Sequence, residues 1–148
     1  MDLMLQGKTA LVIGASRGLG YATAHLLSAE GANVIINGRS EQSIMDAAKK
    51  ITSETGGQVL PLSGDITDLR LPTELVEKSA QQFGGLDIVI ANAGGPPPGS
   101  FESLNDDAWY KAVELSLMSQ VRLIRAALPW LQKSKNASVL TITSLSVK

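Results

Sequence analysis

Five short apolar runs, rich in Val and Ile, alternate along this chain with longer segments of helical periodicity. The apolar runs cover residues 8–13, 33–37, 58–62, 86–91 and 138–143. Helices are expected between them at residues 18–30, 40–55, 68–83 and 106–133. Short β-branched runs bounded by Gly, Asn or Pro are typical of strands. Alternating strands and helices form right-handed crossovers, so the pattern predicts a parallel sheet with helices on both faces.

The first expected strand leads directly into a glycine-rich turn, VIGASRGLG, at residues 12–20. Its glycines are spaced G-x-x-x-G-x-G and open the first expected helix. Gly14 permits a tight turn, Gly18 lets the backbone approach a pyrophosphate closely, and Gly20 lets the helix pack closely on the strand. The free N–H groups of the helix N-terminus favour phosphate. The turn therefore indicates nucleotide binding, and the alternative is a strand-to-helix turn that only needs positive φ.

Composition limits the classes of partner that this chain is expected to bind. Its 148 residues suit one domain with a buried core. With 13 basic and 14 acidic residues, no strong field attracts nucleic acid or an anionic membrane, so a small-molecule partner is expected. Cysteine is absent, which excludes disulfides and thiolate metal sites, and no metal site is expected. No apolar run approaches the roughly 18 residues of a membrane span. The apolar run near the start lacks a basic leader, so a cytoplasmic protein is expected.

Four segments resemble, in order, the motifs of the short-chain dehydrogenase/reductase family. The glycine turn resembles T-G-x-x-x-G-x-G, with Ile13 where the family usually has Thr. SGDITD contains Asp65 after the third strand, where the family's aspartate contacts adenine. ANAG resembles the N-N-A-G element and keeps Asn92, and LTITSLS resembles the strand that ends in the catalytic serine, here Ser144.

The resemblance implies a doubly wound parallel sheet, a Rossmann fold, with strand order 3-2-1-4-5. Residues 1–148 are then the dinucleotide-binding part of a single-domain enzyme of about 250 residues, without the last strands of the family fold. The cofactor contacts that the resemblance implies fall on Gly14, Ser16, Arg17, Gly18, Leu19, Gly20, Arg39, Asp65, Ile66, Asn92, Ala93 and Gly94.

Two of these polar residues also have structural interpretations. Asp65 can instead cap the helix that follows it. Asn92 can hold neighbouring strands together through its amide, and the resemblance itself implies such a role beside the cofactor.

The end of the second strand, NVIINGRS, bears on which nicotinamide cofactor binds. NAD-binding family members usually place an acid there, which accepts hydrogen bonds from the ribose hydroxyls and repels a 2′-phosphate. This chain has Gly38 and Arg39 instead, and Arg17 is expected on the same side. Two guanidinium groups can flank the phosphate with charge-assisted hydrogen bonds, so NADP(H) is the predicted cofactor. The alternative is that both are solvated surface arginines.

Apolar faces of the helices predict how they pack. The first helix carries Leu19, Ala22 and Leu26 on one face, which indicates a core face. The long helix carries two faces. One consists of Val113, Leu117, Val121, Ile124, Leu128 and Leu131. The other consists of Leu115, Leu123, Ala126, Ala127 and Trp130. One face packs on the sheet and the other needs a further cover. In the resembled family a second subunit supplies part of that cover, so a homodimer or homotetramer is expected.

The family's chemistry uses a serine, a tyrosine that acts as general acid, and a lysine four residues after that tyrosine. Within these 148 residues, Tyr21 is followed four places on by His25, and Tyr110 by Glu114. The family's helix asparagine aligns with Ser116, which can replace it only if a backbone carbonyl does the work. The chain is therefore expected to be the cofactor-binding fragment of a reductase and inactive by itself.

Three functions remain compatible with this pattern. The first is an NADP(H)-dependent oxidoreductase that acts on a carbonyl or alcohol, with a 3-oxoacyl thioester as one candidate substrate. The second is a nonenzymatic NADP(H)-binding protein. The third is a methyltransferase, which needs an acid after the second strand, where Gly38 and Arg39 stand.

Overall fold

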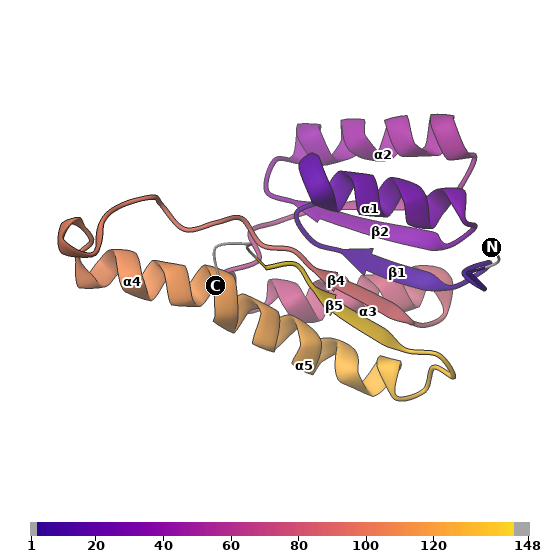
Figure 1. Cartoon of the computed structure of the whole chain (residues 1–148). Helices are drawn as coiled ribbons and strands as arrows, with labels where there is room; N and C mark the ends of the chain where they lie inside the picture. The colour runs from indigo at the N-terminus through magenta and orange to yellow at the C-terminus, as the bar shows by residue number, and fades with distance from the viewer. Residues whose placement is uncertain (1–2, 144–148) are drawn as a thin grey trace.

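Five parallel strands form the centre of the molecule, in the order β3-β2-β1-β4-β5 (Figure 1). The computed structural model describes residues 3–143. The strands are β1 (Thr9–Val12), β2 (Asn33–Gly38), β3 (Val59–Ser63), β4 (Ile88–Ala91) and β5 (Ser138–Thr141). Each pairs in parallel with its neighbour, for example Leu11 opposite Ile35 and Val89. The predicted strand order is confirmed.

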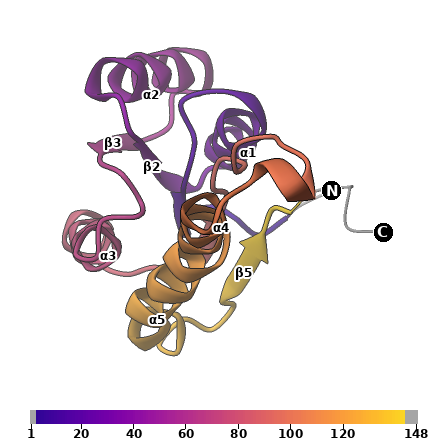
Figure 2. The same cartoon turned by 90° about the vertical axis from the view of Figure 1, so that its left-hand side faces the viewer.

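Helices cover both faces of this sheet, with α1 and α2 on one side and α3 and α5 on the other (Figures 1 and 2). The first three are α1 (Gly18–Ala29), α2 (Glu41–Thr55) and α3 (Leu71–Phe83). After β4 follow η1 (Phe101–Ser103), α4 (Asp106–Val113), η2 (Glu114–Met118) and α5 (Ser119–Leu131). Among residues 3–143, none of the helices has the length and apolar character needed to cross a lipid bilayer.

Alternation along the strands builds two cores. Val12 and Ile36 face α1 and α2, whereas Leu11 and Ile35 face α3 and α5, and all four side chains are fully buried. Strands that are buried on both faces need continuous apolar sequence, which explains the unbroken Val and Ile runs. Full burial of each such side chain stabilises the fold by about 1.5–3 kcal/mol.

The face of α1 that packs on the sheet is the opposite of the predicted one. Leu19 and Leu26 are 67% and 63% exposed. The buried positions of α1 are instead Gly20, Ala24 and Ser28. A methyl group on Gly20 would overlap the carbonyl oxygen of Gly14, so the helix lies too close to the glycine turn for large side chains to fit between them. Close approach therefore selects small residues, and the larger ones face outward.

Two helices also differ from the prediction, one in where it begins and the other in being interrupted. The segment expected as a helix from residue 68 begins at Leu71, because residues 65–70 form a turn held by the Asp65 and Asp68 side chains. The long helix expected at residues 106–133 is interrupted by the π-helical turn η2. There the N–H of Ser119 donates to the carbonyl of Glu114, five residues earlier. The buried Ser119 hydroxyl donates to the Leu115 carbonyl at 2.5 Å, which a regular α-helix would pair with the Ser119 N–H.

Candidate dinucleotide-binding site

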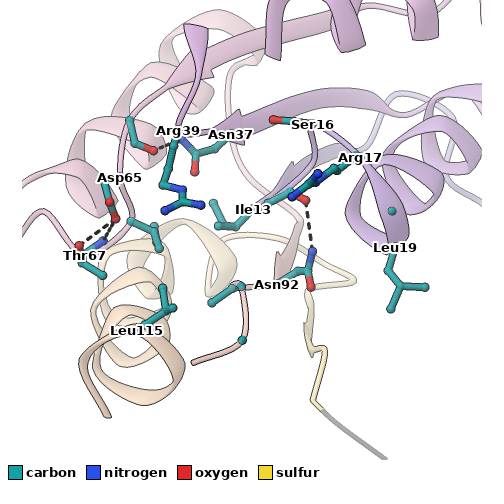
Figure 3. A pocket seen from close by; sticks show the side chains of 18 of the residues that line it. Ile13, Ser16, Arg17, Leu19, Asn37, Arg39, Asp65, Thr67, Asn92 and Leu115 are labelled. Atoms are coloured by element: carbon teal, nitrogen blue, oxygen red, sulfur yellow. Dashed lines mark hydrogen bonds between the residues drawn. The ribbon is translucent and has the colours of Figure 1, made fainter. Parts of the chain in front are cut away.

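A cleft of about 640 Å³ lies at the carboxyl ends of the strands. The loops that follow β1, β2, β3 and β4 line it, and the helical segment around Lys111–Leu115 closes one side. Strand order reverses between β1 and β4, which is where open parallel sheets bind ligands. Figure 3 shows Arg39 and Asp65 toward one end of the cleft and Leu19 toward the other, with Ile13 between them.

The three glycines of the first loop meet three different constraints. Gly14 has φ +64°, and a methyl group there would overlap the Asn92 carbonyl. Gly18 has φ +62°, but nothing lies within 4 Å of the position of its missing side chain. Gly20 lies beneath the turn and does not line the cleft. The backbone at Gly18 is thus open to a ligand, whereas Gly14 and Gly20 are small because protein surrounds them.

The N-terminus of α1 opens onto the same cleft without a cap. The residue before α1, Arg17, makes no side-chain capping bond, and the first turn of α1 contains no acid. By contrast, Ser40 caps α2 by accepting from the Ser43 N–H, and Asn105 caps α4 by accepting from the Ala108 N–H. Uncapped N–H groups at a helix start favour an anion.

Two arginines line the cleft, Arg39 directly after β2 and Arg17 in the loop after β1. Neither Arg17 nor Arg39 has an ion-pair partner among residues 3–143. Gly38, the last residue of β2, directly precedes Arg39, and a methyl group there would overlap the Ser16 hydroxyl unless that hydroxyl rotated away. The end of β2 therefore offers positive charge and carries no carboxylate at position 38.

Asp65 faces the same end of the cleft and does not cap α3. Its Oδ1 accepts from the Thr67 N–H at 3.0 Å and the Thr67 hydroxyl at 2.8 Å, in a turn that ends before the helix starts. The capping alternative is therefore wrong. These two hydrogen bonds, with a smaller contribution from the Arg39 charge, hold the pKa of Asp65 below its usual value. Its other carboxylate oxygen has no partner among residues 3–143 and can accept a hydrogen bond.

Asn92 follows β4 and ties it to the glycine turn. Its side-chain amide donates to the Gly14 carbonyl at 3.3 Å (Figure 3). The predicted structural role of Asn92 is confirmed, and the residue also lines the cleft.

The wall contributed by the helices was not predicted from the sequence. Lys111, Glu114 and Leu115 line the cleft there. Arg122 donates to both carboxylate oxygens of Glu114, at 3.0 Å for the Nη2–Oε2 pair, and these hydrogen bonds lower the pKa of Glu114. Because Glu114 is paired with Arg122, its charge opposes an anion in the cleft less than a free carboxylate would. The only feature of the sequence that indicates this wall is that Lys111 and Leu115 are one helical turn apart and so share a face of the helix.

The structure brings most of the predicted site residues together. Those that line the cleft are Gly14, Ser16, Arg17, Gly18, Leu19, Arg39, Asp65, Ile66, Asn92, Ala93 and Gly94. Gly20 supports the turn from below. Ser116 lies in η2, is exposed and does not line the cleft, and Ser144 lies outside the described residues. No cluster of His, Asp or Glu suited to a metal ion occurs in the described part of the chain.

Fold and cleft together define an α/β protein of the dinucleotide-binding, doubly wound class. The family model for short chain dehydrogenase matches residues 8–148. This chain therefore belongs to the short-chain dehydrogenase family, and that membership disagrees with the methyltransferase alternative.

Individual relatives agree with this assignment. The chain is 37% identical over 145 residues to the uncharacterized oxidoreductase YvaG of Bacillus subtilis, covering 97% of this chain and 53% of YvaG. L-sorbose reductase from Gluconobacter frateurii, complexed with NADPH and L-sorbose, superposes with a TM-score of 0.93 at 29% identity, over 98% of this chain and 55% of that one. A 3-oxoacyl (acyl-carrier-protein) reductase from Agrobacterium tumefaciens with NADP bound gives 0.86 at 32% identity, over 95% and 54%. The chain thus spans about half the length of these relatives.

Proposed function

We propose that this chain is the NADP(H)-binding part of an oxidoreductase that transfers hydride between nicotinamide and a carbonyl or alcohol. The observation that carries the proposal is the end of β2, where Arg39 lines the cleft without an ion-pair partner in the described chain. A guanidinium group there suits the 2′-phosphate that distinguishes NADP(H) from NAD(H).

Three further observations support this cofactor. Gly38 stands at the end of β2, where NAD-dependent relatives usually carry the ribose-binding acid. Arg17 supplies a second unpaired guanidinium in the same cleft. Two reductases that superpose on this chain were solved with NADPH or NADP.

In this proposal each part of the cleft takes one part of the cofactor. The N–H groups at the start of α1 and the open backbone at Gly18 take the pyrophosphate. Asp65 accepts a hydrogen bond from the adenine amino group, beside the apolar side chain of Ile66. The residues that follow β4, Asn92 to Gly94, lie nearest the nicotinamide side.

Cofactor selectivity tests the proposal. In Arg39→Ala the dissociation constant for NADPH should rise by about 10–100-fold, because one charge-assisted hydrogen bond contributes about 1.5–3 kcal/mol. The constant for NADH should change little. Titration of both cofactors into the parent, Arg39→Ala and the control Arg70→Ala measures this, since Arg70 is exposed and lies outside the cleft. An equal loss for NADPH and NADH would show that Arg39 does not recognise the phosphate.

We further propose that these 148 residues bind the cofactor without turning it over. Neither Tyr21 nor Tyr110 has a lysine four residues later, and Ser116 replaces the family's asparagine. A positioned general acid contributes about 10²–10⁴-fold to such a rate. The alternative, a nonenzymatic NADP(H)-binding protein, rests on the same residues. The two functions predict different activity for a longer chain.

The assay follows nicotinamide absorbance with NADPH, ketones and 3-oxoacyl thioesters, for residues 1–148 and for a chain extended past Lys148. Turnover only by the extended chain supports the enzyme. No turnover by either supports the binding protein, and equal turnover by both would contradict the proposal that residues 1–148 do not turn the cofactor over.

A further inference from the structure

Asn37 is a buried polar residue at the carboxyl end of β2, only 2% exposed, and it lines the cleft. Its side-chain amide donates to two carbonyl oxygens, that of Leu62 near the end of β3 at 2.9 Å and that of Gly64 directly after β3 at 3.3 Å. A buried amide normally has its hydrogen bonds satisfied, and these two use both N–H groups of Asn37.

The main chain of the same residue holds a different loop. The Ala15 N–H, in the glycine turn, donates to the Asn37 carbonyl at 2.9 Å. The next carbonyl, of Gly38, accepts from the Gly64 N–H at 3.0 Å. Two successive residues of β2 therefore connect the loop after β1 with the loop after β3 across the floor of the cleft.

These two loops hold the opposite ends of the proposed cofactor site. The glycine turn contains the phosphate-facing backbone, and Gly64 directly precedes Asp65. The bonds from Asn37 therefore fix where Asp65 stands relative to the phosphates before any cofactor arrives. A preset spacing removes the cost of ordering the loop on binding.

We propose that Asn37 is a positioning residue that presets the adenine half of the cleft, an inference that rests on the proposed function. The side chain must donate twice, because two carbonyl oxygens face it. A carboxylate of the same shape accepts but does not donate, so Asn37→Asp sets a negative charge against both oxygens. Asn37→Leu removes the donors without adding charge.

The test measures NADP⁺ affinity from pH 5 to pH 8 for the parent, Asn37→Asp, Asn37→Leu and the control Asn33→Asp. Asn33 lies at the other end of β2, away from the cleft. At pH 8 we expect Asn37→Asp to weaken binding by at least about tenfold and Asn33→Asp to leave it unchanged. The other charged side chains that line the cleft are Arg17, Arg39, Asp65, Lys111 and Glu114, so every profile is divided by that of the parent.

The pH dependence separates positioning from a general loss of stability. As the pH falls, the introduced carboxyl of Asn37→Asp becomes protonated and regains a donor, so its affinity should recover toward that of the parent. Asn37→Leu should stay weak at every pH. Parent-like affinity of Asn37→Asp at pH 8, or an equal loss in both variants at every pH, would overturn the proposal.

A second measurement needs no cofactor. Amide hydrogen exchange in the unliganded protein should accelerate at residues 64–67 in both Asn37 variants and stay unchanged in the buried part of α2 around Ile51. Unchanged exchange at residues 64–67 would overturn the role of Asn37 even if NADP⁺ binds. If the parent protein binds no NADP⁺, the proposed function is contradicted. The positioning role of Asn37 is then tested by the hydrogen-exchange result alone. If either variant fails to fold, Asn37→Thr, which keeps one donor, takes its place and should show an intermediate effect.

Discussion

Gly14, Gly18 and Gly20 stand in one motif, yet the chain requires glycine at each for a different reason. Gly14 combines a positive φ with contact from the Asn92 backbone. Gly20 is restricted only by contact, with the Gly14 carbonyl. Gly18 has a positive φ and open space around it, so it is restricted by its own backbone and by whatever enters the cleft.

Alanine substitutions separate these reasons. Gly84 is a matched reference, because its φ is +81° and nothing lies within 4 Å of its missing side chain, far from the cleft. Gly18→Ala and Gly84→Ala should each lower the free energy of unfolding by about 1–2 kcal/mol through backbone strain alone. Gly14→Ala adds an overlap with backbone, and its total cost should be about 2–5 kcal/mol. Urea unfolding of the three variants measures this order.

Cofactor titration then distinguishes the two strain-only variants. Gly18 lines the cleft with open space at its missing side chain, so a methyl group there would compete with the proposed pyrophosphate, and NADP⁺ should bind at least about tenfold more weakly to Gly18→Ala. Gly84→Ala should bind it as the parent does. Parent-like binding by Gly18→Ala would mean that the phosphates do not lie over this turn.

At the scale of elements, periodicity predicted which segments form strands and helices but not which face of a helix is buried. The apolar face of α1 was assigned wrongly because small residues, not large ones, allow α1 to approach the glycine turn. The π-helical turn was also missed, since it depends on the Ser119 hydroxyl reaching the Leu115 carbonyl, and a serine in a helix gives no such signal in the sequence.

The two apolar faces of the long helical segment are now distinguished. Leu123 and Ala127 are buried against the sheet, with Leu115 and Trp130 packed beside them. The outer stripe of Val113, Leu117 and Leu128 is 46–55% exposed. Exposed apolar side chains in a row along a helix favour association.

We therefore expect self-association through the outer stripe. Leu117→Glu should shift the protein toward monomer, because association through the outer stripe would bury the introduced carboxylate. Leu26 on α1 is exposed to a similar extent, 63% against 55% for Leu117, and Leu26→Glu should leave the assembly unchanged. Light scattering over a concentration series measures both. A parent that stays monomeric at high concentration would contradict this expectation.

For the whole molecule, the strand order and most of the cleft could be predicted because they follow from local signals. Alternating strands and helices define the sheet, and the carboxyl ends of its strands then gather Gly14, Arg39, Asp65 and Asn92. What could not be predicted depends on contacts distant in sequence. Lys111 lines the cleft beside loops that follow strands much earlier in the sequence, and Asn37 donates hydrogen bonds to residues 25 and 27 positions away.

The central claim is that NADP(H) lies across the carboxyl ends of the strands. Amide chemical-shift mapping of the ¹⁵N-labelled protein during titration with NADP⁺ tests it most directly. We expect the largest changes at residues 14–20, 38–39, 64–67 and 92–95, which line or support the cleft. The turns at Gly31, Gly56 and Gly84, which precede the amino ends of β2, β3 and β4, should not shift. Changes concentrated at those turns, or no changes at saturating NADP⁺, would contradict the account.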